Sequence, residues 1–342
     1  MKLGNKHMQV LSIFTFAAVI LLFSKPTFAI DDGARAYWKT REGTQGVSFQ
    51  YLRLDLNTDD STQFAPGSYI YPNADIEGSL IIANWVRHMT LFDRPSTFGI
   101  GIAGGDIDVK ANVKVSAPFI PVGKTAGVAF NQSASGFADP SVSLGINLFG
   151  TPPLKSNVDM LNYEPTLTID VAGLLGFPLG KYDNEKLVNI GQNRWFGRIA
   201  LPTKYHFGPR AEGYMTSLEF VPSIWLFAEN DDFINQKMEN DPMYQMEAHL
   251  THDFTRTFWG SLDLLYRGGF QTKIDGVEVG SELDIGDLGF TLNYQINDNL
   301  GIRSGYSSNV FGDSNLENSM FRLQFIYGWN QANENAKKLQ GH

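Results

Sequence analysis

The last strand-like stretch of the chain, Met320–Trp329 (MFRLQFIYGW), has the alternation of a strand with one apolar face. Every second side chain is large and apolar, namely Phe321, Leu323, Phe325, Tyr327 and Trp329. Successive side chains of a strand point to opposite faces, so the intervening residues, Arg322 and Gln324 among them, form a mostly polar face. In a soluble sheet the apolar face would enter a core, whereas in an outer-membrane barrel it would face lipid. The stretch alone leaves both possibilities open.

The first 29 residues have the features of a secretory signal peptide. Lys2 and Lys6 give a basic start, an apolar stretch covers residues 10–23, and Thr27-Phe28-Ala29 places small residues at the −3 and −1 positions. An uncleaved anchor helix is the alternative. After Ala29 no apolar run approaches the roughly 20 residues that a spanning helix needs. The mature chain is therefore expected to be exported, either as a soluble protein or as a membrane barrel.

Composition restricts the partners and the chemistry. The expected cleavage removes three lysines and no acids, which leaves 24 Lys and Arg against 36 Asp and Glu, a formal charge of −12. This balance argues against nucleic acid and anionic membrane surfaces as partners. The chain has no cysteine, which excludes thiol catalysis and cysteine-ligated metal. Its 34 glycines and many aromatic residues suit strands better than helices.

Twelve strand-like segments follow one another along the mature chain. They cover residues 46–57, 75–92, 97–109, 136–149, 164–176, 195–207, 216–228, 243–255, 257–269, 285–296, 299–308 and 319–329. The alternation is clearest in the C-terminal half, where Tyr244, Met246 and Leu250 alternate with Gln245, Glu247, His249 and Thr251.

The lengths of the connections alternate as well. If the first segment runs outward from the periplasm, the links at the periplasmic end are short, apart from a proline-containing link at 150–163 that could hide a small helix. The links at the other end cover 58–74, 110–135, 177–194, 229–242, 270–284 and 309–318. An even strand number with long loops on one side only is the arrangement of bacterial outer-membrane barrels. A soluble sandwich has no reason to sort its loops in this way.

The sequence therefore predicts an all-β fold, a closed antiparallel transmembrane β-barrel of about 12 strands with long extracellular loops and mostly short periplasmic turns. The expected division is a signal peptide at 1–29, an N-terminal periplasmic segment at 30–45, the barrel at 46–329 and a polar periplasmic tail at 330–342. The expected location is the cell outer membrane, with outer-membrane lipid and the barrel-assembly machinery as partners.

Several blocks of sequence resemble a known family. They are Phe177–Asp183 (FPLGKYD), Leu187–Trp195 (LVNIGQNRW), Ala138-Asp139-Pro140, Asn230–Phe233 (NDDF), Asp241–Phe254, Trp259–Tyr266 and the closing Tyr327–Trp329. From about Ala34 to Trp329 the chain is similar to the proteins labelled "putative MetA-pathway of phenol degradation". The resemblance implies an outer-membrane barrel associated with the passage of small hydrophobic or aromatic compounds. The polar tail beyond Trp329 departs from the aromatic residue that usually ends such barrels.

The sequence gives no convincing catalytic or metal site, and no cofactor is expected. Ser261, Asp263 and His249 project to the same face of adjacent strands, so a Ser-His-Asp set can be drawn. That face is the expected lumen, where such residues are ordinary lining, and no Gly-x-Ser-x-Gly motif accompanies them. Asp231 and Asp232 lack the spacing of a calcium loop and are interpreted as solvated carboxylates.

The link between the fifth and sixth segments, residues 178–195, is rich in residues that form turns, which indicates a fixed shape. One interpretation is a loop folded over or into the barrel mouth, with Tyr182, Asp183 and Asn193 as candidate lining residues. The alternative is a loop that only caps the strand ends. Arg194 and Trp195 are expected at the outer membrane interface, where tryptophan side chains anchor.

The expected lumen carries charges of both signs. Candidate lining residues are Arg198, Lys204, Glu247, His249, Asp263, Arg267, Arg303 and Arg322, accompanied by Asp170, Glu219 and Asp253. Opposite charges across a small barrel most often fill and stiffen it, and a pore for anions would show a ladder of one sign. The leading hypothesis is a passive channel for small hydrophobic or aromatic molecules. A narrow porin for hydrophilic solutes and a non-conducting structural barrel remain the alternatives.

Overall fold

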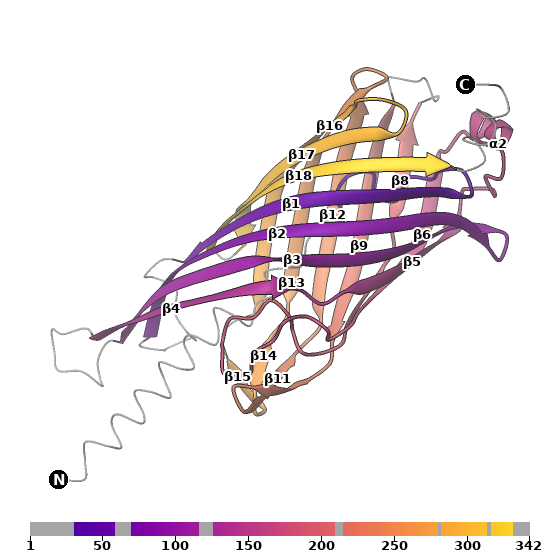
Figure 1. Ribbon diagram of the computed structural model, residues 1–342. Helices are drawn as coiled ribbons and strands as arrows, with labels where there is room; N and C mark the ends of the chain where they lie inside the picture. The colour runs from indigo at the N-terminus through magenta and orange to yellow at the C-terminus, as the bar shows by residue number, and fades with distance from the viewer. Residues whose placement is uncertain are drawn as a thin grey trace, which may run out of the picture.

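The structure is a computed structural model, and it describes residues 31–58, 70–115, 126–208, 215–279, 282–312 and 316–330. These residues form one long, tilted β-barrel with a small helix at one end and a small separate sheet at the other (Figure 1). The expected signal peptide and the tail beyond Asn330 lie outside the described residues. Within the described ranges, no helix has the length and apolar character needed to cross a membrane.

The described strands close into an antiparallel barrel of twelve positions. In chain order they are β1 (Thr44–Thr58), β2 (Ile70–Leu91), β3 (Arg94–Val115), β4 (Ala126–Phe137) with β5 (Ser141–Phe149), β6 (Leu167–Gly176), β7 (Phe196–Ala200) with β8 (Thr203–Phe207), β9 (Thr216–Phe227), β12 (Met243–Asp253), β13 (Phe258–Gly269), β16 (Leu283–Gln295), β17 (Leu300–Gly312) and β18 (Leu316–Asn330). Each strand pairs with its neighbours in the chain, and β18 pairs with β1 from Thr44↔Asn330 to Thr58↔Leu316. The predicted closed, all-β barrel is confirmed.

Two barrel positions are each occupied by two short strands, and proline lies at both breaks. Ala138-Asp139-Pro140 separates β4 from β5, which pair with different parts of β3. Leu201-Pro202 separates β7 from β8, which both pair with β6 and β9. Proline has no backbone N–H to donate, so it interrupts the ladder at these points.

Side chains alternate around the barrel as the sequence predicts. On β18 Phe321, Phe325 and Tyr327 are exposed on the outer surface, whereas Arg322 is buried inside. On β12 Tyr244, Met246 and Leu250 are exposed, whereas Gln245, Glu247 and His249 are buried. An exterior of exposed aromatic and aliphatic side chains is the lipid-facing band of a transmembrane barrel.

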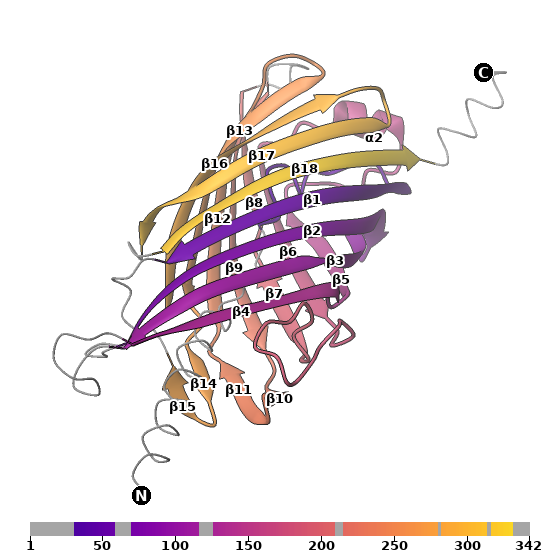
Figure 2. The same ribbon diagram turned by 60° about the vertical axis from the view of Figure 1, so that its left-hand side comes forward.

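Some strands continue well beyond this band. β2 and β3 are each 22 residues long and pair without a break from Leu91↔Arg94 to Ile70↔Val115. At about 3.3 Å per residue they reach roughly 70 Å, far more than the ~25 Å apolar band of an outer-membrane barrel. Much of the link expected at 110–135 is therefore strand, in β3 and β4, and Figure 2 shows these strands converging far from the helix α2. We call the part of β1–β4 and β18 beyond the lipid-facing band the outer extension.

The connections differ at the two ends. The periplasmic link 150–166 contains the small helix α2 (Asn157–Asn162), begun by a capping box between Ser156 and Asp159. At the outer end β10 (Asn230–Phe233), β11 (Gln236–Asn240), β14 (Thr272–Ile274) and β15 (Val277–Val279) form a sheet in that order. These strands lie in links that the sequence analysis treats as loops. Phe233, Met238 and Ile274 pack together beneath them with Leu187 and Ile234.

Candidate functional site

The inner wall of the barrel holds most of the charged residues predicted to line it. Arg198, Lys204, Glu247, His249 and Arg322 are buried inside, and Asp263, Arg267 and Arg303 project to the same interior. Asp170, Glu219 and Thr168 are buried there too. The structure thus places these predicted residues together on the inner wall, with charges of both signs.

The segment before β1, residues 31–43, passes through this lumen. Asp32 donates its backbone N–H to Glu247 on β12 (3.0 Å), and Arg35 donates its backbone N–H to Glu219 on β9 (2.9 Å). Ala34 is completely buried. The position of residues 31–43 inside the barrel corrects the expected place of this segment in the periplasm. The charges of the segment explain why it lies in the lumen, because they are opposite in sign to the wall charges that they meet.

The segment carries acids at its start and bases farther along, and each group pairs with wall residues of the opposite sign. Its acids meet wall arginines: Asp32 pairs with Arg198 (2.6 Å), and Asp31 pairs with Arg322. Its bases meet wall carboxylates, in the pairs Arg35–Asp253 (2.6 Å) and Lys39–Asp170 (2.7 Å). Both partners of these pairs are mostly shielded from solvent, so removing one would leave a buried charge without compensation.

Gly33 and Arg35 turn the segment inside the barrel. Their φ angles are +79° and +63°, in the left-handed region, and a Cβ atom on Gly33 would lie 2.6 Å from Nη1 of Arg322. Glycine fits this turn because it has no side chain to collide there. Trp38 follows and donates its indole N–H to Glu219 (2.7 Å).

The Ser261, Asp263 and His249 set is close together but is not connected as a catalytic triad. Asp263 accepts from His249 Nδ1 (2.8 Å), Ser261 Oγ (2.7 Å) and Thr291 Oγ1 (2.6 Å). Ser261 therefore donates to the carboxylate instead of the imidazole, and the imidazole lies 3.4 Å from Glu247 on its other side. A nucleophilic serine needs the imidazole as its base, so this geometry is that of a polar network in the wall.

Three other predicted wall cations have different partners. Arg267 pairs with Asp287 (2.6 Å). Lys204 lies 5.4 Å from the Trp38 ring, and Arg303 lies 5.0 Å from the Trp259 ring. Among the described residues, neither Lys204 nor Arg303 has a carboxylate within ion-pair distance. No group of three described His, Asp or Glu side chains is placed to hold a metal ion.

Apolar side chains fill the interior toward the outer end of the barrel. One cluster brings together Trp225, Met243, Phe270, Leu283, Ile285 and Leu316, from strands on several sides of the barrel and the link after β13. A second contains Ile76, Ile107, Val109, Val188 and Ile190, and Leu56 packs against both. The interior thus changes from polar to apolar on the way from the periplasmic end to the outer mouth.

Val188 and Ile190 of the second cluster belong to the link between β6 and β7. This link, residues 177–195, reaches across to the inner face of β2 and β3, and Val188 donates its N–H to Gln132 on β4 (2.7 Å). The link therefore folds into the barrel mouth, as one of the two interpretations of its sequence has it. We refer to it as the lid.

Asp139, in the break between β4 and β5, holds the two ends of the lid together. Its carboxylate accepts the backbone N–H groups of Gly180 and Gln192, both at 2.7 Å. Burial raises the pKa of Asp139, and these N–H groups partly oppose that rise. Gly180 and Gly191 are so close that a Cβ on either would meet the other's backbone at about 2.8 Å. Glycine at both positions is therefore a packing requirement.

The lid residues singled out by the sequence take part in its internal bonding. Tyr182 accepts from Asn230 (2.9 Å) and donates to the Asp232 carbonyl (3.1 Å). Asn193, with a φ of +55°, donates to Asn230 (3.0 Å), and Asp183 accepts from the N–H of Glu185 (3.1 Å). The bonds of Tyr182 and Asn193 tie the lid to β10, whereas the bond of Asp183 lies within the lid, and all three residues have a positioning role at the mouth.

The two residues at the exit of the lid lie in different environments. Trp195 is half exposed, which suits the expected membrane interface. Arg194 is buried instead: it donates to Asn240 (2.5 Å), and its guanidinium lies 4.8 Å from the Phe227 ring. Burial lowers the pKa of Arg194 to about 10. The buried position of Arg194 corrects its expected place at the membrane interface, and the interfacial position of Trp195 stays a prediction.

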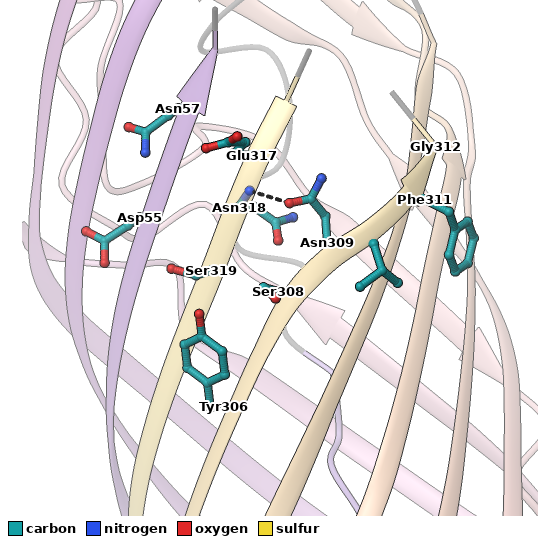
Figure 3. Close-up of a pocket in the computed structure, with 11 residues that line it drawn as sticks. Asp55, Asn57, Tyr306, Ser308, Asn309, Phe311, Gly312, Glu317, Asn318 and Ser319 are labelled. Carbon is teal, nitrogen blue, oxygen red and sulfur yellow. Dashed lines mark hydrogen bonds between the residues drawn. The ribbon is translucent and has the colours of Figure 1, made fainter. Parts of the chain in front are cut away.

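Where β17 meets β18 at the outer end, the ladder stops at Ser308↔Ser319. Beyond it Asn309 bridges the strands with its side chain, donating to Leu316 O (2.6 Å) and accepting from Asn318 N (2.8 Å). Figure 3 shows this region, a polar groove of about 570 Å³ lined also by Asp55, Asn57 and Glu317.

Sequence reasoning missed the contribution of Asp31, Asp32, Arg35, Trp38 and Lys39 to the site. A usable signal was present, because acids and then bases follow the expected cleavage site in a short stretch, and the predicted lumen carries both signs. Asp139 and Asn230 were noted as parts of motifs, but their role as anchors of the lid depends on residues about 40 positions away.

Comparison with known proteins agrees with this geometry. The model of the family described as "Putative MetA-pathway of phenol degradation" matches residues 59–325. The chain belongs to this family. A search of the curated proteins found no match.

Among solved structures, the COG4313 outer membrane channel from Pseudomonas putida F1 is similar to this member of the family, with a TM-score of 0.60 and 16% identity over 88% of this chain and 100% of that one. The transport unit of the autotransporter AIDA-I from Escherichia coli matches with a TM-score of 0.47 and 10% identity, over 91% and 97% of the two chains. The TodX deltaS2S3 mutant monoaromatic hydrocarbon channel matches with 0.37 and 11%, over 85% and 91%. The first match shows the fold of this family member, a closed antiparallel β-barrel.

Proposed function

We propose that the protein is a passive outer-membrane channel for small hydrophobic or aromatic compounds. The observation that carries the proposal is the apolar interior beneath the lid, where the two outer clusters offer contacts to an apolar solute. Ligand sites are typically lined by apolar and aromatic side chains with a few polar groups. The family to which the chain belongs concerns phenol degradation, which supports the same class of solute.

The alternatives are weaker on the geometry. A porin for hydrophilic solutes needs a water-filled polar passage, whereas residues 31–43 and their ion pairs occupy the polar part of this lumen. A purely structural barrel has no need of an apolar mouth beneath a folded lid. An enzymatic role lacks a serine bonded to the imidazole, and Ser261 instead supports Asp263. Outer-membrane lipid and the barrel-assembly machinery are the partners that a barrel of this kind would have.

Uptake by whole cells tests the proposal. Cells whose outer membrane carries the protein would be given labelled toluene, at limiting concentration, or a labelled hydrophilic sugar. We expect the protein to raise toluene uptake and to leave sugar uptake unchanged. Faster entry of sugar alone would favour the porin, and no effect on either solute would favour the structural barrel.

Lid variants sharpen this test. The double variant Val188→Asp and Ile190→Asp, or deletion of residues 183–192, should change the rate or selectivity of uptake because both apolar contacts with the wall are lost. Leu179→Asp is the matched control, since Leu179 lies in the same lid but is exposed. Ser261→Ala should change uptake little. A lipid-hydrolysing activity abolished by Ser261→Ala would contradict the channel function altogether.

A further inference from the structure

A second cavity lies at the periplasmic end of the lumen, apart from the outer apolar clusters. It has a volume of about 440 Å³, and the walls include Arg35, Trp38, Trp259, Asn293, Arg303 and Ile326. They come from the N-terminal segment, β13, β16, β17 and β18, near the periplasmic ends of those strands. This volume falls in the range of small-molecule sites. We call this cavity the periplasmic chamber.

Arg303 is the exceptional group in the chamber. Its guanidinium contacts the Trp259 ring at 5.0 Å, and its Nε is buried without a hydrogen-bond partner. No described residue accepts a hydrogen bond from Arg303 or forms an ion pair with it. A guanidinium carries five N–H donors, and a buried donor that stays unpaired costs free energy.

The neighbouring carboxylates have other partners. Asp253 pairs with Arg35 at 2.6 Å. Glu219 accepts from the backbone N–H of Arg35 and from the Trp38 indole. Asp263 has three donors of its own, His249, Ser261 and Thr291. The wall therefore provides Arg303 with a fixed position but with no anion.

The guanidinium is also held in place by its surroundings. Arg35 lies over the same Trp259 ring, at 4.3 Å, and over Trp38 at 4.1 Å, so two guanidinium groups and two indoles form one stacked group. With its amide turned so that the oxygen faces the indole, Asn293 accepts from Trp259 Nε1 (3.2 Å). Arginine stacked on aromatic rings is preorganised to bind carboxylate with its planar fork.

We infer that the periplasmic chamber binds a small organic monocarboxylate, with its carboxylate on Arg303 and its apolar body against Ile326 and the indoles. The exposed Asp298 at the rim of the chamber disfavours a ligand with two or more negative charges. The site is separate from the outer apolar clusters, and binding there holds whether or not the barrel conducts hydrophobic solutes.

Calorimetric titration of the purified full-length mature protein in detergent, at neutral pH, tests this site. The probes are benzoate, its neutral analogue benzyl alcohol and inorganic phosphate. We expect benzoate to bind, and benzyl alcohol to bind about tenfold more weakly or less, because it cannot accept charge-assisted hydrogen bonds from a guanidinium as a carboxylate does. Phosphate should bind more weakly than benzoate. Failure of benzoate to bind, or equal affinity for either other probe, would overturn the inference.

Variants assign the binding to Arg303. Arg303→Gln should weaken benzoate binding about tenfold or more, whereas the charge-matched control Arg94→Gln, at the exposed first residue of β3, should leave it unchanged. Heat-modifiable mobility in electrophoresis reports folding. If Arg303→Gln does not fold, Arg303→Lys keeps the charge but loses the fork, and it should bind benzoate measurably more weakly. Wild-type affinity in the folded variant would overturn the inference.

The tail after Asn330 provides the last arm of the test. Asn330, the last described residue, lines the chamber. A chain truncated after Asn330 should bind benzoate as the full chain does. Binding that appears only after truncation would identify the tail as the occupant and would contradict the proposed ligand.

Discussion

Two regions of the same strands place their apolar side chains on opposite faces. In the membrane-facing part of β3, Ile100 and Ile102 point outward and are 43% and 52% exposed. In the outer extension, the outward face of β3 carries the charged residues Asp106, Asp108 and Lys110. The apolar residues Ile107 and Val109 there point inward and are buried. The register of β2 and β3 is continuous through both regions. The change of the apolar side from the outer to the inner face therefore does not come from a shift in strand register.

This difference between the two regions of β3 shows that two properties of a strand have separate causes: the two-residue alternation of its side chains, and which of its two faces is apolar. The two-residue period belongs to the backbone. The apolar side is the one that faces lipid in the membrane and the one that faces the packed interior beyond it. Arg53, Asp55 and Glu77 mark the exterior of the outer extension, where they form exposed ion pairs.

The largest expected effect contrasts ion pairs in the two regions. Arg198→Met leaves Asp32 and Glu247 buried without their shared cation, and we expect a loss of about 3–5 kcal/mol in the free energy of unfolding. Arg53→Met removes an exposed pair in the outer extension and should cost no more than about 1 kcal/mol. Urea unfolding in lipid vesicles would measure both. Equal losses would mean that the lumen is as well solvated as the exterior.

A charge placed on the outer surface contrasts lipid with water. Phe325→Arg on β18 should cost about 2–4 kcal/mol if the site lies near the bilayer midplane, and it should impair assembly. Ser319→Arg puts the same group on the same face of the same strand, opposite Asp55, and should be tolerated within about 0.5 kcal/mol. Heat-modifiable mobility and urea unfolding report the outcome. Similar damage from both would place Ser319 within the lipid band.

The smallest expected effect concerns truncation of isoleucine on β3. Ile107→Ala opens a cavity in the cluster with Ile76 and Val109 and should cost about 2 kcal/mol or somewhat more. Ile102→Ala removes a side chain that touches lipid, so surrounding lipid can fill the space and the loss should be smaller. Hydrogen exchange of the β2–β3 amides would localise the change. A larger loss of stability for Ile102→Ala than for Ile107→Ala would contradict the conclusion that Ile102 faces lipid and Ile107 faces the packed interior.

Much of the barrel could be read from residue patterns. The alternation in β12, β13, β16 and β18 predicts their inner and outer faces, because a strand period is a local property. The sequence analysis did not predict that β3 continues to Val115 or that β4 begins at Ala126, because polar residues such as Asp108 and Lys110 resemble a loop where the strand passes from lipid into water. The short strands β11 and β14 pair across 32–36 residues, from Met238↔Ile274 to Asn240↔Thr272, and no local pattern records this pairing.

For the lid and the lumen as well, the sequence predicts some features and only the tertiary structure shows the others. Turn-forming residues between Pro178 and Trp195 indicate a fixed loop shape, but only the packing of Val188 and Ile190 against Ile76 and Val109 decided that it lies in the mouth. Charge counts predict a lumen of mixed sign. The place of residues 31–43 was decided by ion pairs such as Arg198–Asp32 and Asp253–Arg35, whose partners are more than 160 positions apart.

By itself, then, the sequence determined the strand order, the closed antiparallel class and the sign of the charges inside, since each depends on local periodicity or composition. The tertiary structure decided which buried charges meet which partners, and it left Arg303 beside Trp259 without an anion among the described residues. The physical reason is that burying a charge makes its pairing obligatory, while the identity of the partner depends on which distant strands the closed barrel brings together.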